Sequence, residues 1–309
     1  MNAATYKRGG PEDLAYAEAP DMLPAMAAKP SIAIVGAGRL GTALAIGLRR
    51  AGYTISEIVS RNNVASKRNA ATLGRKVHAR PTTVANVRLN ADVIWLCVPD
   101  REIKNLANKV ASTIDWKRKI AFHSSGALSS DELSILRQRG AAVGSIHPLM
   151  TFVSGSIPSL KGVPFAMEGD AAAIRAARRI AKDLEGEAFT IRKQHKTAYH
   201  AWGSFASPLL VATLVTTERL ARAAGLSVRE ARRKMLPIVK QTIANYETLG
   251  PAGAFSGPIV RGDTEIVRKH LRMLKKVPEA REVYLALARA AVRYLPGRNR
   301  AQLKKALEN

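Results

Sequence analysis

Six consecutive residues near the start of the sequence have the types and spacing of a phosphate-binding turn. They are Gly36, Ala37, Gly38, Arg39, Leu40 and Gly41. The pattern G-x-G-x-x-G lies here between a β-branched run and a helix-like stretch rich in alanine and leucine. In that context it predicts a dinucleotide site, in which the glycines make the turn, admit a pyrophosphate and allow close helix–strand packing. The N–H groups that open the helix would face the phosphates.

The end of the second expected strand indicates which dinucleotide is bound. An NAD site usually has Asp or Glu there for the ribose 2′-hydroxyl, whereas this chain has Ser60, Arg61 and Asn62. These side chains can donate to a 2′-phosphate, which a carboxylate would repel. The sequence therefore predicts NADP(H), with Arg39 as a second cation. Glu57, inside the strand, is the nearby acid that could reverse this preference, and Arg61 could instead be an ordinary exposed loop residue.

Lys196 and His200 have the spacing for proton transfer. At positions i and i+4 of a helix they share one face and could meet one ligand. Hydride transfer to a carbonyl needs a proton donor for the alkoxide that forms, and a lysine of lowered pKa or a histidine can supply it. An ordinary solvated helix start is the alternative for both.

Other polar candidates follow strands, where ligands of open α/β sheets lie. Those expected to border the cofactor are Val98, Pro99 and Asp100, and those expected to bind substrate are His123, Ser124, Ser125 and His147. His147 could instead position its loop. Arg261 could bind an acidic substrate or close a turn with Asp263.

The remaining chemistry-bearing residues are assigned no catalytic role. Cys97 lies in an apolar run and is expected to be a buried structural thiol. The isolated histidines His78, His195 and His270 are expected at the surface. No spacing resembles a metal site.

Alternating strands and helices are expected to position these residues. The expected strands are Ser31–Val35, Ile55–Val59, Val77–Ala79, Ala91–Val98, Lys119–His123, Ala141–Ile146, Val163–Met167 and Ala188–Ile191. The expected helices of this half are the stretch that ends at Arg50, Ala65–Leu73, Ile103–Val110 and Ala171–Leu184. From about Gln194 the pattern becomes helical, over Ala198–Ala224, Val228–Tyr246, Asp263–Lys276 and Glu279–Tyr294, with a Gly/Pro-rich loop at Gly250–Gly262. The fold class is thus α/β, a Rossmann-type mostly parallel sheet domain (residues 30–192) followed by an all-α domain (193–309).

Length and composition limit the class of protein. A chain of 309 residues fits two domains. Met1–Lys29 is expected to be a flexible tail. With one cysteine, no signal peptide and no long uncharged run, the chain is expected to be cytoplasmic and without a membrane segment. The net charge of +25 attracts phosphates, but the basic residues are spread over helices without interleaved aromatics, so no specific nucleic-acid binding is expected.

Several stretches together resemble a bacterial family of Rossmann-like proteins whose C-terminal half is called domain of unknown function 2520. They are Ile34–Leu44, Val98–Asp100, His123–Leu128, His147–Phe152, Phe165–Asp170, Lys196–Ala201 and Gly257–Asp263. The family is described as NADP-binding oxidoreductases, with 6-phosphogluconate and β-hydroxyacid dehydrogenases, pyrroline-5-carboxylate reductase and deazaflavin-dependent NADP reductase as broader relatives. The resemblance implies a 6-phosphogluconate-dehydrogenase-like helical domain and a homodimer.

The resemblance also implies residue roles. In the β-hydroxyacid dehydrogenases a serine-bearing segment holds the substrate carboxylate, and His123–Gly126 lies in the similar place. The same enzymes use a lysine for proton transfer and, four residues later, an asparagine for substrate. Lys196 matches the lysine, but His200 stands in place of the asparagine.

The first hypothesis is therefore an NADP(H)-dependent oxidoreductase that acts on a small, carboxylated substrate between sheet and helical domain. A non-catalytic NADP(H)-binding regulator or structural protein is the alternative, and a basic nucleic-acid-associated protein is the third.

Overall fold

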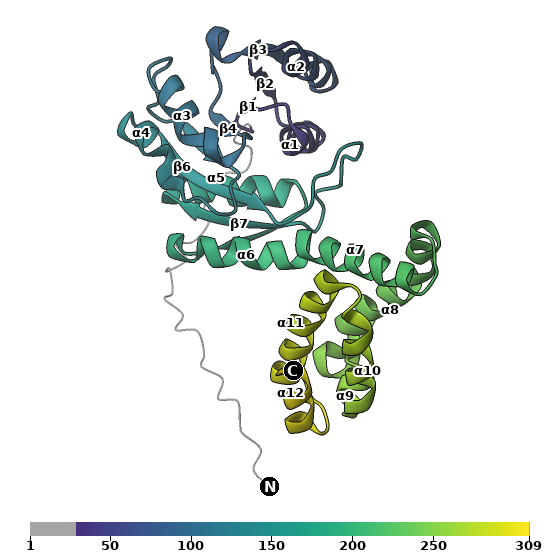
Figure 1. The fold of residues 1–309 in the computed structure, drawn as a ribbon. Coiled ribbons are helices and arrows are strands. Elements are labelled where there is room, and N and C mark those ends of the chain that lie inside the picture. The colour runs from purple at the N-terminus through teal and green to yellow at the C-terminus, as the bar shows by residue number, and fades with distance from the viewer. Residues whose placement is uncertain (1–28, 309) are drawn as a thin grey trace. The chain divides into compact units, whose positions relative to one another are not determined.

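The computed structural model describes residues 29–308, so the predicted N-terminal tail lies outside the described residues apart from Lys29. The chain divides into two compact units between Gln194 and His195. The first contains all the strands of the described chain, and the second contains helices (Figure 1). No helix in the described part combines the length and the apolar character needed to span a bilayer.

The first unit is built on an eight-stranded sheet. Its strands are β1 (Ile32–Val35), β2 (Ile55–Ser60), β3 (Arg80–Thr83), β4 (Val93–Leu96), β5 (Ile120–His123), β6 (Ala142–Pro148), β7 (Pro164–Gly169) and β8 (Glu187–Thr190). Their order in the sheet is β3-β2-β1-β4-β5-β6-β7-β8. All neighbouring pairs are parallel except β6 and β7, which are antiparallel. The α/β class and mostly parallel sheet are thus confirmed.

Helices cover both faces of this sheet. They are α1 (Arg39–Arg50), α2 (Val64–Val77), α3 (Asp100–Val110), α4 (Ser134–Gln138) and α5 (Ala171–Asp183), with short 3-10 turns η1 (Val84–Asn86), η2 (Ser130–Leu133) and η3 (Lys193–His195). Alternate strand residues point to opposite faces. Ile34 and Trp95 therefore pack in the core with α1, α2 and α5, whereas Val35 and Leu96 pack in the core with α3 and α4.

The second unit consists of α6 (Lys196–Ala206), α7 (Pro208–Ala223), α8 (Val228–Ala254), α9 (Pro258–Arg261), α10 (Thr264–Leu274), α11 (Pro278–Tyr294) and α12 (Arg300–Glu308). Its buried core is contributed by α10, α11 and α12 through Val267, Leu271, Leu285, Ala288, Leu303 and Leu307. Over its 27 residues α8 buries only Ala231. It begins at Ser227, whose hydroxyl accepts from the N–H of Glu230 while the Glu230 carboxylate accepts from the Ser227 N–H.

Three expected element boundaries were wrong. The stretch expected as one helix is divided at Ser207 because Pro208 begins α7 and cannot continue the hydrogen bonding of α6. Helix α2 runs through Val77 and ends at His78 in the left-handed conformation, so β3 begins only at Arg80. The expected loop at 250–262 contains the last turn of α8, which follows a break at Gly250 (φ 69°), and the whole of α9.

Candidate functional site

The glycine turn lies between β1 and α1, as the motif predicts. Gly36 has a φ of 117°, and a Cβ there would collide with the carbonyl oxygen of Cys97, while a Cβ on Gly41 would collide with the carbonyl oxygen of Gly36. Both positions thus require glycine for the fold itself. A Cβ on Gly38 would meet nothing within 4 Å. The protein leaves open space at the residue whose main chain is expected to approach a pyrophosphate.

The end of β2 presents Arg61 and Asn62 to solvent directly before α2. Both side chains are exposed. The next residue, Asn63, caps α2 by accepting a hydrogen bond from the Ser66 N–H at 2.8 Å. Ser60 is different, because it is buried and its hydroxyl, which has one proton to donate, lies 3.2 and 3.3 Å from the carbonyl oxygens of Arg61 and Thr82. Of the three predicted phosphate donors, Arg61 and Asn62 have accessible side chains and Ser60 supports the sheet.

Glu57 lies inside β2 and is committed to other partners. Its side chain is buried and forms an ion pair with Arg80, the residue opposite it on β3. The second carboxylate oxygen accepts from the N–H of Leu89 at 2.9 Å. A carboxylate with these partners does not bind a ribose hydroxyl. Glu57, the nearby acid that could have favoured NAD, therefore does not contribute to the expected cofactor site.

The carboxyl ends of the central parallel strands lie at one edge of the sheet. The register pairs Val35 with Leu96, and Leu96 with His123, so the segments that follow these residues leave the sheet side by side. Cys97 connects them to the glycine turn, since its carbonyl oxygen and Cβ lie against Gly36 and Gly41. The structure therefore brings the predicted glycine, Val98–Asp100 and His123–Ser125 segments to the same edge.

Ser125 holds two of these segments together. Its hydroxyl donates to the carboxylate of Asp100, the first residue of α3, at 2.8 Å. The same oxygen accepts from the N–H groups of Ala127 and Leu128 at 3.1 and 2.9 Å. Because the Ser125 hydroxyl is saturated and the side chain is buried, its role here is to join the loop after β5 to α3.

His123 supports the same loop from within. Its ring is fully buried, Nδ1 accepts from the N–H of Ser125 at 3.1 Å, and Nε2 lies 3.0 Å from the carbonyl oxygen of Ser129. A carbonyl can only accept, so Nε2 carries the proton and the ring is neutral in this arrangement. Both nitrogens are used by the main chain, which favours loop positioning over substrate contact.

Lys196 and His200 both lie on α6, as predicted, but their surroundings differ. Lys196 is 1 % exposed, whereas His200 is exposed. The second buried residue of α6 is Tyr199, whose pKa burial raises to about 12. The sequence did not single out Tyr199, because a tyrosine in a helix gives no signal distinct from core packing. The i, i+3 spacing from Lys196 was the signal available.

The other candidates are placed as follows. His147 lies near the end of β6, two residues beyond Ser145, the neighbour of His123 in the register. Arg261 donates to Asp263 at 2.8 Å, which agrees with a role in closing the turn, the alternative to binding an acidic substrate. His270 is not an unpartnered surface residue, because its Nδ1 lies 3.2 Å from the Tyr284 hydroxyl. Within residues 29–308 no three metal-binding side chains come together.

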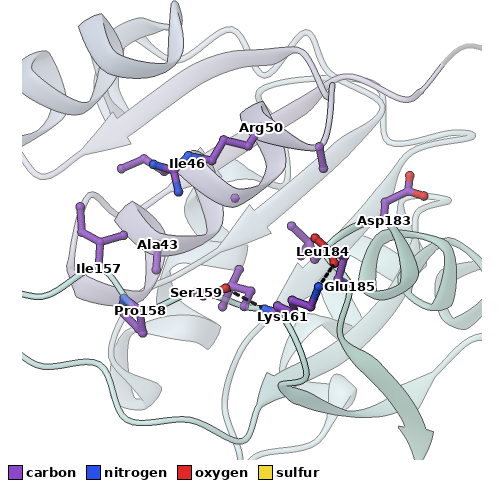
Figure 2. Close-up of a pocket in the computed structure, with 13 residues that line it drawn as sticks. Ala43, Ile46, Arg50, Ile157, Pro158, Ser159, Lys161, Asp183, Leu184 and Glu185 are labelled. Atoms are coloured by element: carbon purple, nitrogen blue, oxygen red, sulfur yellow. Dashed lines mark hydrogen bonds and ion pairs between the residues drawn. The ribbon is translucent and has the colours of Figure 1, made fainter.

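A cavity of about 320 Å³ lies away from all these residues (Figure 2). Its walls come from α1 between Ala43 and Arg50, from the segment Ile157–Lys161 and from Asp183–Glu185 at and after the end of α5. Lys161 pairs with Glu185 at 2.8 Å. None of the predicted site residues lines it.

Two family models match consecutive parts of the chain, and the second begins within the sheet unit, before β7. A model described as a Rossmann-like domain matches residues 18–148, and one described as domain of unknown function 2520 matches residues 163–291. No curated protein sequence matches the chain.

Solved structures share the fold across almost the whole chain. A protein of Bacteroides fragilis, named as a candidate NADP oxidoreductase, is 24 % identical, with a TM-score of 0.71 over 85 % of this chain and 97 % of its own. A pyrroline-5-carboxylate reductase of Coxiella burnetii is 15 % identical, with a TM-score of 0.55 over 91 % and 98 %. A reductive aminase of Aspergillus terreus, solved with NADPH and ethyl-5-oxohexanoate, is 15 % identical, with a TM-score of 0.61 over 86 % and 94 %.

Three findings point to the same family. They are the motifs at the carboxyl edge of the sheet, the two matching family models and the fold shared with the solved structures. The chain therefore combines a Rossmann-like domain with a domain of unknown function 2520, which confirms the resemblance inferred from its sequence motifs.

Proposed function

We propose that the protein is an NADP(H)-dependent oxidoreductase that acts on a small, carboxylated substrate. The observation that carries the proposal is the pairing of an open glycine turn at Gly38 with a β2 end that offers Arg61 and keeps Glu57 bound to Arg80. The turn suits a pyrophosphate, and the cationic end suits a 2′-phosphate. The fold is shared with an NADPH-bound reductive aminase, which is consistent with this assignment.

The proposed chemistry divides between cofactor and protein. NADPH, when bound, supplies a hydride, and reduction of a carbonyl then requires one proton at the oxygen. Lys196 is the proposed proton donor because its amino group is buried at the start of α6. Tyr199, buried on the same helix and protonated at neutral pH, is a second candidate donor. The exposed His200 is a weaker candidate than its sequence position suggests.

Titration calorimetry of the full chain tests the proposal. We expect heat of binding with NADPH and weaker binding with NADH. If neither nucleotide produces heat with folded protein, the proposal is wrong. If NADPH binds but is not oxidised with any of a panel of keto acids, aldehydes and imines, the non-catalytic regulator is the better assignment.

We further propose that the protein is a homodimer formed through α6, α7 and α8. These helices expose large apolar side chains, namely Trp202, Phe205, Leu209, Val211, Val215, Ile238, Ile243, Tyr246 and Leu249. Trp202, Phe205 and Tyr246 are 57, 71 and 61 % exposed. At about 150–250 Å² for each aromatic side chain, they leave roughly 300–450 Å² uncovered. A specific interface needs about 800 Å² from each partner, so these three alone supply about half of it.

Sedimentation measurements test the dimer. Ile238→Asp, at a residue 69 % exposed on α8, should convert it to monomers. Leu287→Asp, at a residue 51 % exposed on α11, is the matched control and should leave the assembly intact. A wild-type protein that remains monomeric at micromolar concentration would exclude this interface.

A further inference from the structure

The hydroxyl of Ser124, directly after β5, does not share the partners of the adjacent Ser125. The indole N–H of Trp95 donates to Ser124 Oγ at 2.8 Å. Trp95 is fully buried in β4, and its ring meets the ring of Phe122 edge to face, with centroids 5.4 Å apart. The packing fixes the direction of the indole N–H, so the hydrogen bond to Ser124 is held by the core of the sheet.

The side chain of Cys97 lies near the same hydroxyl. Burial raises the pKa of its thiol to about 12, so the sulfur keeps its proton at neutral pH. The Cβ of Cys97 lies 3.2 Å from the position that a Cβ on Gly41 would take. Cys97 thus lies between Ser124 and the glycine turn.

A serine hydroxyl has one proton to donate and two lone pairs to accept with. At Ser124 the indole N–H occupies one lone pair, and the nearby sulfur of Cys97 is only a weak acceptor for the hydroxyl proton. A ligand oxygen is a stronger acceptor than a thiol sulfur, so the hydroxyl proton would go to such an oxygen. At Ser125, by contrast, the proton is given to Asp100.

We propose that Trp95 is a positioning residue that holds the Ser124 hydroxyl as a donor for an oxygen atom of a ligand bound at the carboxyl edge of the sheet. This inference rests on the proposed function, because the ligand would be the nicotinamide nucleotide or its substrate. The acceptor is either the carboxamide oxygen of the nicotinamide or a carboxylate oxygen of the substrate. Both are oxygen atoms that accept a hydrogen bond, and titration with different ligands distinguishes between them.

The test follows the indole N–H signals of ¹⁵N-labelled full-length protein by NMR. The chain has three tryptophans, Trp95, Trp116 and Trp202, so three indole signals are expected and each is assigned by a Trp→Phe variant. Ser124→Ala should shift the Trp95 signal and increase its hydrogen exchange. Trp116 is the matched control, since it is equally buried but donates to the carbonyl oxygen of Val110. An unmoved Trp95 signal would overturn the proposal.

Ligands then identify the acceptor. Adenosine 2′,5′-bisphosphate lacks nicotinamide and should leave the Trp95 signal in place. A shift with NADP⁺ alone indicates the carboxamide, whereas a shift only when pyruvate joins NADP⁺ indicates a carboxylate. Either shift should be absent from Ser124→Ala. If NADP⁺ binds by calorimetry and neither ligand moves the signal, the inference is wrong although the proposed function stands. If NADP⁺ does not bind, the proposed function fails, and the Ser124→Ala spectrum still tests the indole contact.

Kinetics provide a readout that a purely structural role would not change. With a substrate found by screening, Trp95→Phe should raise KM about two- to tenfold, the effect of one lost hydrogen bond. The same substitution should have no further effect in the Ser124→Ala background, because the two residues would act as a unit. Trp116→Phe should leave KM unchanged. Additive effects of Trp95→Phe and Ser124→Ala would contradict the positioning role.

Discussion

Removal of the Arg61 side chain should change cofactor preference without changing the fold. Arg61 is exposed in the two-residue segment between β2 and the cap of α2, so Arg61→Ala removes no core packing. The cap at Asn63 and the Glu57–Arg80 pair remain in place. The unfolding transition of the variant should therefore be close to that of the wild type.

The size of the effect follows from the chemistry of the contact. A hydrogen bond between charged groups contributes about 1.5–3 kcal/mol, or roughly 10- to 150-fold in affinity. Because Arg61 is exposed and its charge is screened by salt, we expect the lower end, about tenfold, for NADPH at physiological ionic strength. NADH lacks the 2′-phosphate, so its affinity should change by less than about twofold.

Calorimetric titration of both nucleotides into the same preparations measures this selectivity. Arg75→Ala is the matched control, since it removes an exposed arginine from the last turn of α2 rather than from the segment before its first turn. An equal loss of NADPH and NADH affinity in Arg61→Ala would remove this residue from the 2′-phosphate site. If Arg75→Ala lowers NADPH affinity by the same factor as Arg61→Ala, the effect comes from the change in net charge and not from a contact with the 2′-phosphate.

Three further perturbations test other parts of the site. Gly38→Ala should preserve the melting temperature, since a Cβ there meets nothing within 4 Å, and should weaken NADPH binding in calorimetry; unchanged binding would contradict the pyrophosphate position. Cys97, whose pKa burial raises to about 12 from 9.0, should resist alkylation by iodoacetamide at pH 8 in the native protein and react when it is unfolded. The unfolded thiol ionises above pH 9 while the folded one stays protonated, so this group should lower stability as pH rises from 9 toward 12, and Cys97→Ala should reduce that slope in denaturant titrations. Lys196→Ala should lower kcat with little change in NADPH affinity, and unchanged turnover would exclude it as the proton donor.

Much of the site was predictable because it rests on local pattern. The glycine turn is defined by six neighbouring residues between a strand and a helix, and the structure places it there. Sequence also places Arg61 after β2, since the end of that strand is marked by a polar segment. Both features are set within a short stretch of chain, where spacing and residue type are sufficient.

The rest depends on contacts between residues that are distant in sequence. Glu57 could not be set aside from sequence, because its partners Arg80 and Leu89 lie 23 and 32 positions away. The difference between Ser124 and Ser125 is likewise tertiary, since it is made by Trp95 on one side and Asp100 on the other. Sequence treated the two serines as equivalent, although the Ser125 hydroxyl is saturated by the protein and the Ser124 hydroxyl accepts a hydrogen bond from the indole of Trp95.

The antiparallel pairing of β6 with β7 has a consequence for how such a protein can acquire new substrates. Since β7 starts opposite the end of β6, the connecting residues 149–163 leave and re-enter the sheet at the same border that carries the glycine turn. A hairpin-type connection, unlike a crossover helix, has no set length. Insertions or deletions there would alter the surroundings of the reaction while every strand kept its register, so evolution could change selectivity at this loop without rebuilding the scaffold.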